Sequence, residues 1–144
     1  MNRTILLVDC FSILLLILGW WVAFASYPGL PPKIPTHFNF RGEVDAMGAS
    51  WMIFLLPATS TVISIFNYFA FRSAVSSGKL PASALLPQHC LLLELAFIFT
   101  YITWRSCEVA FGRARGIGNK VILISIALVF LTVIWQVMAK RGRG

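Results

Sequence analysis

Polar side chains that could bind a ligand gather in a short segment in the first third of the chain. His37, Asn39, Glu43 and Asp45 lie within nine residues of one another, and the Arg-Gly dipeptide at residues 41–42 is a typical turn signal. A turn at that point predicts that the four side chains converge. Three interpretations remain open: a metal site, a site for a ligand or peptide, and mutual hydrogen bonds that lock the turn.

The chemistry of these four residues favours the lock over catalysis. Imidazole and carboxylate ligands suit zinc or manganese, but one histidine with two acids and an amide is a weak metal signal without an HExxH or CxxC motif. The chain also has no serine in a nucleophile-elbow context and no glycine loop that would cradle phosphate. We therefore predict a non-enzymatic protein without a metal or other cofactor.

The polar residues belong to a longer interruption, residues 27–50, which holds four of the seven prolines. Proline fixes φ and removes a backbone donor, so helix is not expected there and the chain should be extended through Pro35. Residues 36–40 then alternate with the period of a strand. We predict a hairpin or extended ribbon on a membrane surface, with Ser50 capping the helix that follows.

The composition places this segment in a membrane protein. Hydrophobic residues make up 58% of the 144 residues and charged residues only 12%, against about 45–50% and about 25% in soluble domains. A soluble core of this size could not bury so much apolar surface. The net charge of +7 comes from residues that flank apolar runs, which favours contact with anionic lipid and not with nucleic acid.

The apolar residues form four runs, each close to the roughly 20 residues that span the hydrocarbon core as a helix. The fold class predicted is an all-α membrane protein, a four-transmembrane-helix bundle in one domain (1–144) with a Pro-rich loop between its first two helices. Arg72 is expected to end the second helix and Asn119 to cap the fourth. The predicted helices span residues 5–26, 51–71, 83–104 and 120–139.

Four spans place both termini and the 73–82 loop on one side of the membrane, and residues 27–50 and the 105–119 connector on the other. The positive-inside rule does not decide the orientation, because each side carries six basic residues. Three acids dilute the charge on the loop side, and we therefore expect the termini in the cytoplasm. The terminal side has Arg3, Arg72, Lys79, Lys140, Arg141 and Arg143, and the loop side has Lys33, Arg41, Arg105, Arg113, Arg115 and Lys120.

Several polar residues fall inside the apolar runs. Antiparallel helices place them in the third of the membrane nearest the termini. An ionised carboxylate in lipid costs roughly 2.5–3.5 kcal/mol at the bilayer centre, so Asp9 and Glu94 should face the bundle. They form either an ion or proton path or, as we favour, interhelical hydrogen bonds. The set comprises Asp9, Asn67, Arg72, His89, Glu94 and Gln136.

Residues 34–48, Ile-Pro-Thr-His-Phe-Asn-Phe-Arg-Gly-Glu-Val-Asp-Ala-Met-Gly, resemble the signature of a bacterial membrane family. That family is the domain of unknown function found in the N-terminal half of SdpI-type immunity proteins and alone in short proteins. Residues 101–118 also resemble the stand-alone members, whereas the 73–82 connector is shorter and less polar than theirs. The matching positions in the signature are Pro35, His37, Asn39, Gly42, Glu43, Asp45 and Gly48.

This resemblance implies a multi-pass protein of the bacterial inner membrane. Full SdpI-type proteins carry a second membrane domain, for which this chain has no room, and act in immunity to a secreted toxin and in signalling to a repressor. The first hypothesis is therefore an immunity or sensory module whose 34–48 loop binds a peptide toxin or a membrane protein. The alternative is a small ion- or proton-coupled transport subunit that uses Asp9 and Glu94.

Overall fold

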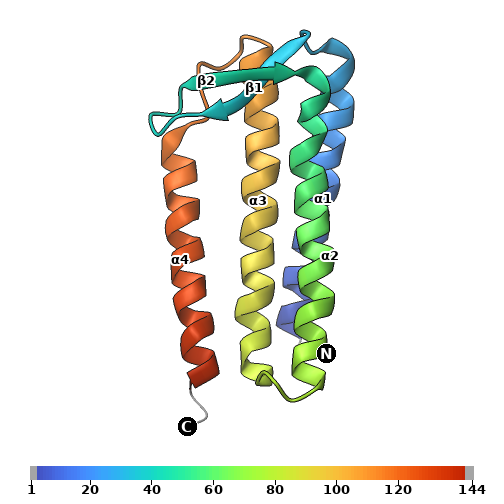
Figure 1. The fold of residues 1–144 in the computed structure, drawn as a ribbon, viewed down its shortest axis with the longest axis vertical. Coiled ribbons are helices and arrows are strands. Elements are labelled where there is room, and N and C mark those ends of the chain that lie inside the picture. Colours follow the sequence, from blue (N-terminus) through green and yellow to red (C-terminus); the bar gives the residue numbers. More distant parts are fainter. Residues whose placement is uncertain (1–2, 142–144) are drawn as a thin grey trace.

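The computed structural model describes residues 3–141; Arg143, one of the basic residues counted above, lies outside them. Within that range the chain forms four long helices and one hairpin of two short strands (Figure 1). All four helices are long and apolar enough to cross a membrane. The predicted fold class is therefore confirmed. The helices are α1 (Arg3–Ser26), α2 (Leu55–Ser76), α3 (Leu85–Ala110) and α4 (Asn119–Arg141), and the strands are β1 (Lys33–Phe38) and β2 (Val44–Ala49).

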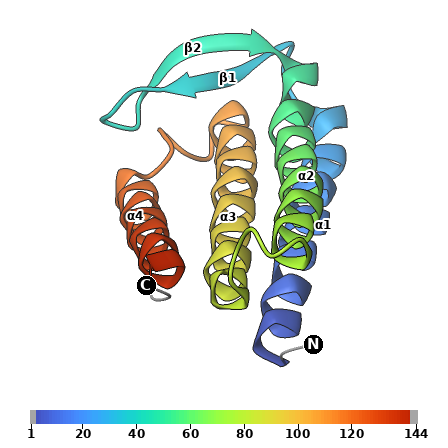
Figure 2. The same cartoon turned by 60° about the horizontal axis from the view of Figure 1, so that its bottom comes forward.

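Helix α3 lies at the centre of the bundle and packs against each of the other three helices. Its closest partner is α1, where Gly19 faces Thr100. A Cβ atom at Gly19 would lie 2.9 Å from the Thr100 hydroxyl, which itself donates to the Leu15 carbonyl oxygen at 2.9 Å. A small residue permits this close approach of two membrane helices. Helix α4 packs mainly on α3, so it stands at one side of the bundle (Figure 2).

The hairpin and the 111–118 connector lie at one end of the bundle, here called the hairpin end. The start of α1, the end of α4 and the 77–84 connection lie at the other, here called the terminal end (Figure 1). The strands are antiparallel, with Lys33 opposite Ala49 and Phe38 opposite Val44. Ile34 on β1 is only 1% exposed and enters a core with Ala23 and Cys107. The hairpin is thus packed onto the helices and does not hang free above them.

Four local expectations differ from the structure. Pro28 lies inside a short 3-10 turn, Tyr27–Gly29, because proline is tolerated where a backbone donor needs no partner. Ser50 does not cap through its side chain; it begins a second 3-10 turn, Ser50–Phe54, and its backbone nitrogen donates to the Pro32 carbonyl oxygen. Helix α2 does not end at Arg72 but continues for another turn to Ser76. Asn119, expected to cap α4, is the first residue of that helix, and its side-chain nitrogen donates to the Phe40 carbonyl oxygen of the hairpin.

Candidate functional site

The turn of the hairpin is built around Asn39. Its side-chain oxygen accepts hydrogen bonds from the backbone nitrogens of Arg41 (2.8 Å) and Glu43 (3.1 Å). Its side-chain nitrogen donates to a carboxylate oxygen of Glu43 at 3.0 Å. Gly42 adopts φ +78°, a left-handed conformation that glycine tolerates best. An asparagine that bonds its own backbone in this way favours a turn over continued strand.

Beside the turn, His37 and Asp45 form the second polar pair of the hairpin. The imidazole Nδ1 atom lies 2.5 Å from a carboxylate oxygen of Asp45. The side chains are 68% and 42% exposed, respectively, so both remain accessible. An ionised carboxylate only accepts hydrogen bonds, and the pair therefore sets Nδ1 as the donor and leaves Nε2 for another partner.

The other residues of the 34–48 signature have structural roles. Pro35 is buried on β1. A Cβ atom at Gly48 would lie 2.7 Å from the Thr36 side chain on the opposite strand, so glycine is required for the strands to approach. A Cβ atom at Gly42 would overlap the side chain of Asn119. The signature thus combines three residues that shape the hairpin with the two polar pairs.

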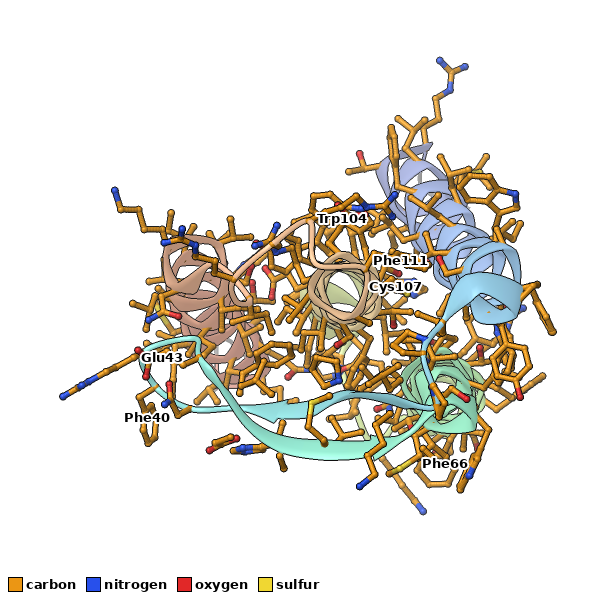
Figure 3. All side chains as sticks on the ribbon, turned by 90° about the horizontal axis from the view of Figure 1, so that it is seen from above. Phe40, Glu43, Phe66, Trp104, Cys107 and Phe111 are labelled. Carbon is orange, nitrogen blue, oxygen red and sulfur yellow. The ribbon has the colours of Figure 1, made fainter. Side chains whose placement is uncertain are left out.

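The hairpin turn is docked on the connector between α3 and α4. The carbonyl oxygen of Gly42 accepts from the Ile117 backbone nitrogen at 2.9 Å. The Asn119 side chain donates to the Phe40 carbonyl oxygen at 2.8 Å. The connector is held in turn by the Tyr101 hydroxyl, which donates to the Ile117 carbonyl oxygen at 2.7 Å. In the view from above, the hairpin runs along one side of the bundle to α4, and Phe40 points away from the helices (Figure 3).

Among residues 3–141, no ion pair joins the hairpin acids to the arginines of the connector. Glu43 and Asp45 take their partners from the hairpin itself, as described above. On the connector side, Glu108 pairs with Arg113 at 2.8 Å, and Arg105 donates to the Gly116 carbonyl oxygen. Partners a few residues away form these contacts at a smaller cost in chain entropy than distant ones.

A groove of about 540 Å³ lies between the hairpin and the helices. The His37–Asp45 pair and Asn39 line it on the hairpin side. Thr36, Phe38 and Phe40 complete the hairpin side. The helices and the connector supply the rest, which is apolar apart from Asn119 at the start of α4. Mostly apolar walls with a few polar groups are typical of ligand-binding sites. The apolar lining includes Leu56, Ile102, Ile117, Ile122, Leu123 and Ile126.

A metal site is not supported by the side-chain arrangement. Among residues 3–141, no three His, Cys, Asp or Glu side chains lie close enough together to hold a metal ion. The polar groups of the hairpin instead satisfy one another in two separate pairs.

The polar residues of the terminal half of the membrane form a second set of contacts. His89 Nδ1 lies 2.5 Å from an Asp9 carboxylate oxygen, which joins α3 to α1. Gln88 donates to the side-chain oxygen of Asn67 at 3.2 Å and accepts a hydrogen bond from Gln136. One polar network therefore links α2, α3 and α4.

Glu94 and Arg72 lie apart from that network. Thr132 donates to one carboxylate oxygen of Glu94 at 2.7 Å. The other oxygen is buried and has no hydrogen-bond partner among the described residues. Arg72 donates to the Tyr68 hydroxyl one turn earlier on α2, at 3.0 Å. The structure thus brings Asp9 together with His89 and Asn67 with Gln88 and Gln136, but it does not bring Asp9 and Glu94 together.

Sequence reasoning missed several of these partners. It placed His89 at the depth of Asp9 but did not pair the two. It gave no role to Gln88, although a glutamine inside an apolar run is itself a signal of a buried hydrogen bond. Thr132 and Tyr101 carry no comparable signal, because both residue types are common on apolar helix faces.

Residues 14–61 match a protein-family model. They cover the second half of α1, the whole hairpin and the start of α2, so every residue of the 34–48 signature lies within the match. This segment is a DUF1648 domain. The name stands for a domain of unknown function, and it assigns no activity. Searches of the curated proteins and of the solved structures found no match. The connector that holds the DUF1648 hairpin, and the whole of α3 and α4, lie outside the matched residues.

Proposed function

We propose that this small multi-pass membrane protein is a non-enzymatic binding module, related to the SdpI-type immunity proteins, that recognises a partner with its DUF1648 hairpin. The partner would be a peptide toxin or a segment of a membrane protein. The proposal rests on the groove beneath the hairpin, where the accessible His37–Asp45 pair borders apolar helix surface.

The groove suits an amphipathic peptide better than a small polar solute. Apart from Asn119, which donates to the Phe40 carbonyl oxygen, its helix-side lining is apolar, so an apolar side chain would gain free energy on entering it. The exposed imidazole of His37 and the exposed carboxylate of Asp45 would supply the polar contacts that select one partner. Docking of the turn on the connector holds these groups in place before binding, which lowers the entropy cost of association.

We place the protein in the bacterial inner membrane with both termini in the cytoplasm. The hairpin would then face the outside of the cell, where a secreted toxin arrives. Enzymatic reporters fused after Lys79 and within residues 112–115 would test this: a reporter active only outside the cytoplasm should work at the second position alone.

A second candidate is a transport subunit, favoured by one observation, the buried and unpartnered carboxylate oxygen of Glu94. Against it, Asp9 is engaged by His89, and within residues 3–141 no hydrogen bond joins it to Glu94, which accepts from Thr132. Ion flux into liposomes, measured for the wild type and for Asp9→Asn and Glu94→Gln, would test this candidate. Absence of wild-type flux, or flux unaltered in both variants, would exclude it.

The immunity proposal is tested in a bacterial host that lacks its own SdpI-type protein and is exposed to the secreted toxin. Wild-type protein should protect the host, whereas His37→Ala and Asp45→Ala should lose protection at equal expression. Leu123→Trp should also abolish protection, because the larger ring fills the groove from α4.

Leu131→Trp is the matched control for the groove variant. Leu123 and Leu131 are both on α4 and both 62% exposed, but Leu131 does not line the groove. Its substitution should leave protection intact. If wild-type protein fails to protect, immunity is excluded; if the hairpin variants protect fully, the hairpin is not the binding site.

A further inference from the structure

A basic pocket of about 520 Å³ lies at the hairpin end between the hairpin turn, α3 and the start of α4, and neither His37 nor Asp45 lines it. Its lining includes four basic residues, one from the hairpin turn and three from residues 105–120. Glu43 is the one acid among the lining residues, and it is bonded to Asn39. The basic residues are Arg41 of the hairpin, Arg105 of α3, Arg115 of the connector and Lys120 of α4.

These cations lack the partners that would normally neutralise them. Among residues 3–141, no carboxylate forms an ion pair with any of the four, whereas the nearby Arg113 is paired with Glu108. Arg105 is fixed by its bond to the Gly116 carbonyl oxygen. Its Nε atom is nevertheless buried and without a hydrogen-bond partner in the described chain. A buried donor of this kind costs free energy unless an acceptor reaches it, and the neighbouring charges indicate an anionic acceptor.

The basic pocket continues into an apolar groove along the helices. Val121 lines both, and the groove of about 460 Å³ runs between α1, α3 and α4. On α4 it extends from Val121 to Leu128, which is about 10 Å along the helix axis. Leu15, Leu93 and Phe97 supply its apolar surface, and Glu94 lies at its deeper part with one oxygen bonded to Thr132.

We propose that this composite site binds one anionic phospholipid. The phosphate would lie among Arg41, Arg105, Arg115 and Lys120 at the membrane surface, and an acyl chain would occupy the groove below. The four basic side chains favour an anionic headgroup, since basic pockets between membrane helices attract such lipids. The adjoining apolar groove favours a lipid over a free phosphate ester, because only a lipid has an acyl chain to fill it. The site is independent of the toxin-binding proposal, because it uses neither His37 nor Asp45.

The test uses the full chain purified in detergent and offered an equimolar mixture of phosphatidylglycerol and phosphatidylcholine with identical acyl chains. Native mass spectrometry measures which lipid remains bound. Wild-type protein should retain one phosphatidylglycerol with at least tenfold preference. The double variant Arg115→Gln/Lys120→Gln should weaken that binding by roughly 10- to 30-fold, as expected for the loss of two basic contacts to an anionic headgroup. Both side chains are exposed, so the variant should fold.

The control is the double variant Lys33→Gln/Lys79→Gln, which removes the same net charge away from the pocket. Lys33 begins β1, at the end of the hairpin opposite the turn, and Lys79 lies at the terminal end. Its lipid preference should stay within twofold of the wild type. Equal losses in both double variants, or no preference in the wild type, would overturn the proposal. Displacement of the lipid by an equal concentration of glycerol 3-phosphate would also overturn it, because the groove would then contribute nothing.

Discussion

The same polar pair occurs at both ends of this bundle, in opposite surroundings. His37 and Asp45 at the hairpin end, and His89 and Asp9 towards the terminal end, each place Nδ1 2.5 Å from a carboxylate oxygen. The hairpin pair is 68% and 42% exposed, whereas the second pair is 11% and 28% exposed. One pair therefore remains available to a partner, and the other ties α1 to α3 across 80 residues of sequence.

The two regions also differ in what holds them. At the hairpin end, backbone groups carry most of the contacts: the Asn39 turn, the Gly42 carbonyl oxygen and the connector around Ile117. Towards the terminal end, side chains such as Gln88 bond one another inside the helices. Backbone support leaves the His37–Asp45 pair exposed, while the polar side chains of the second region bond one another between the helices.

The largest loss of stability is expected from a substitution that disturbs the backbone contacts of the hairpin end. Gly42→Ala should destabilise the protein by about 1–2 kcal/mol from its positive φ and by about 1–3 kcal/mol more from overlap with Asn119. Gly78→Ala is the matched control, since Gly78 has φ +73° but a Cβ atom there meets nothing within 4 Å. Unfolding in mixed micelles measures both. Equal losses in the two variants would show that docking on Asn119 contributes no stability.

Substitution in the buried His89–Asp9 pair should have the second largest effect on the free energy of unfolding. Asp9→Asn should lower the free energy of unfolding by about 1–2 kcal/mol, because it weakens a partly buried charged hydrogen bond between two helices. A double-mutant cycle with His89→Gln isolates the coupling between the two side chains. A coupling energy near zero would mean that the pair does not join α1 to α3.

The amide network should have a smaller effect. Gln136→Leu should cost about 0.6 kcal/mol, the average for hydrogen bonds between membrane helices, since the Gln88 side chain keeps its bond to Asn67. The micelle unfolding assay is again the measurement, with Gln88→Leu as the comparison. Gln88 bonds both neighbours, so its substitution should cost more; the reverse order would contradict the chain of contacts from α2 to α4.

The smallest effect on stability is expected at the exposed pair. Asp45→Asn should change the free energy of unfolding by no more than about 0.5 kcal/mol, as for other solvent-exposed pairs. The same variant should lose protection against toxin, which separates recognition from stability. A loss as large as that of Asp9→Asn would show that both pairs are structural, and the contrast between the two regions would disappear.

Much of the fold was predictable from the chain because membrane-spanning length and hydropathy are local properties. Four apolar runs became four helices, and the proline-rich segment with Arg41-Gly42 became a hairpin with its turn at that point. The predictions failed at helix ends such as Arg72 and Ser50. There, hydropathy falls before helical hydrogen bonding does, and the end is set by tertiary contacts and by the local turn.

Whether the partner of a polar residue could be predicted also depended on how far apart the two residues are in sequence. His37 and Asn39 find their partners within eight residues, so the convergence of the hairpin side chains followed from one turn. Asp9 and its partner His89 are separated by 80 residues. Their pairing depends on the depth and rotation of two helices, which hydropathy does not encode.

The sequence by itself determined the number of spans and the hairpin with its turn, because each depends on residues close together in the chain. Only the tertiary structure decided that α3 is central, that the Gly42 carbonyl oxygen accepts from Ile117, and that Asp9 pairs with His89. Helix packing angles and rotations arise from many weak contacts summed over whole faces. The packing that results from these contacts buries the His89–Asp9 pair between helices and leaves the His37–Asp45 pair exposed.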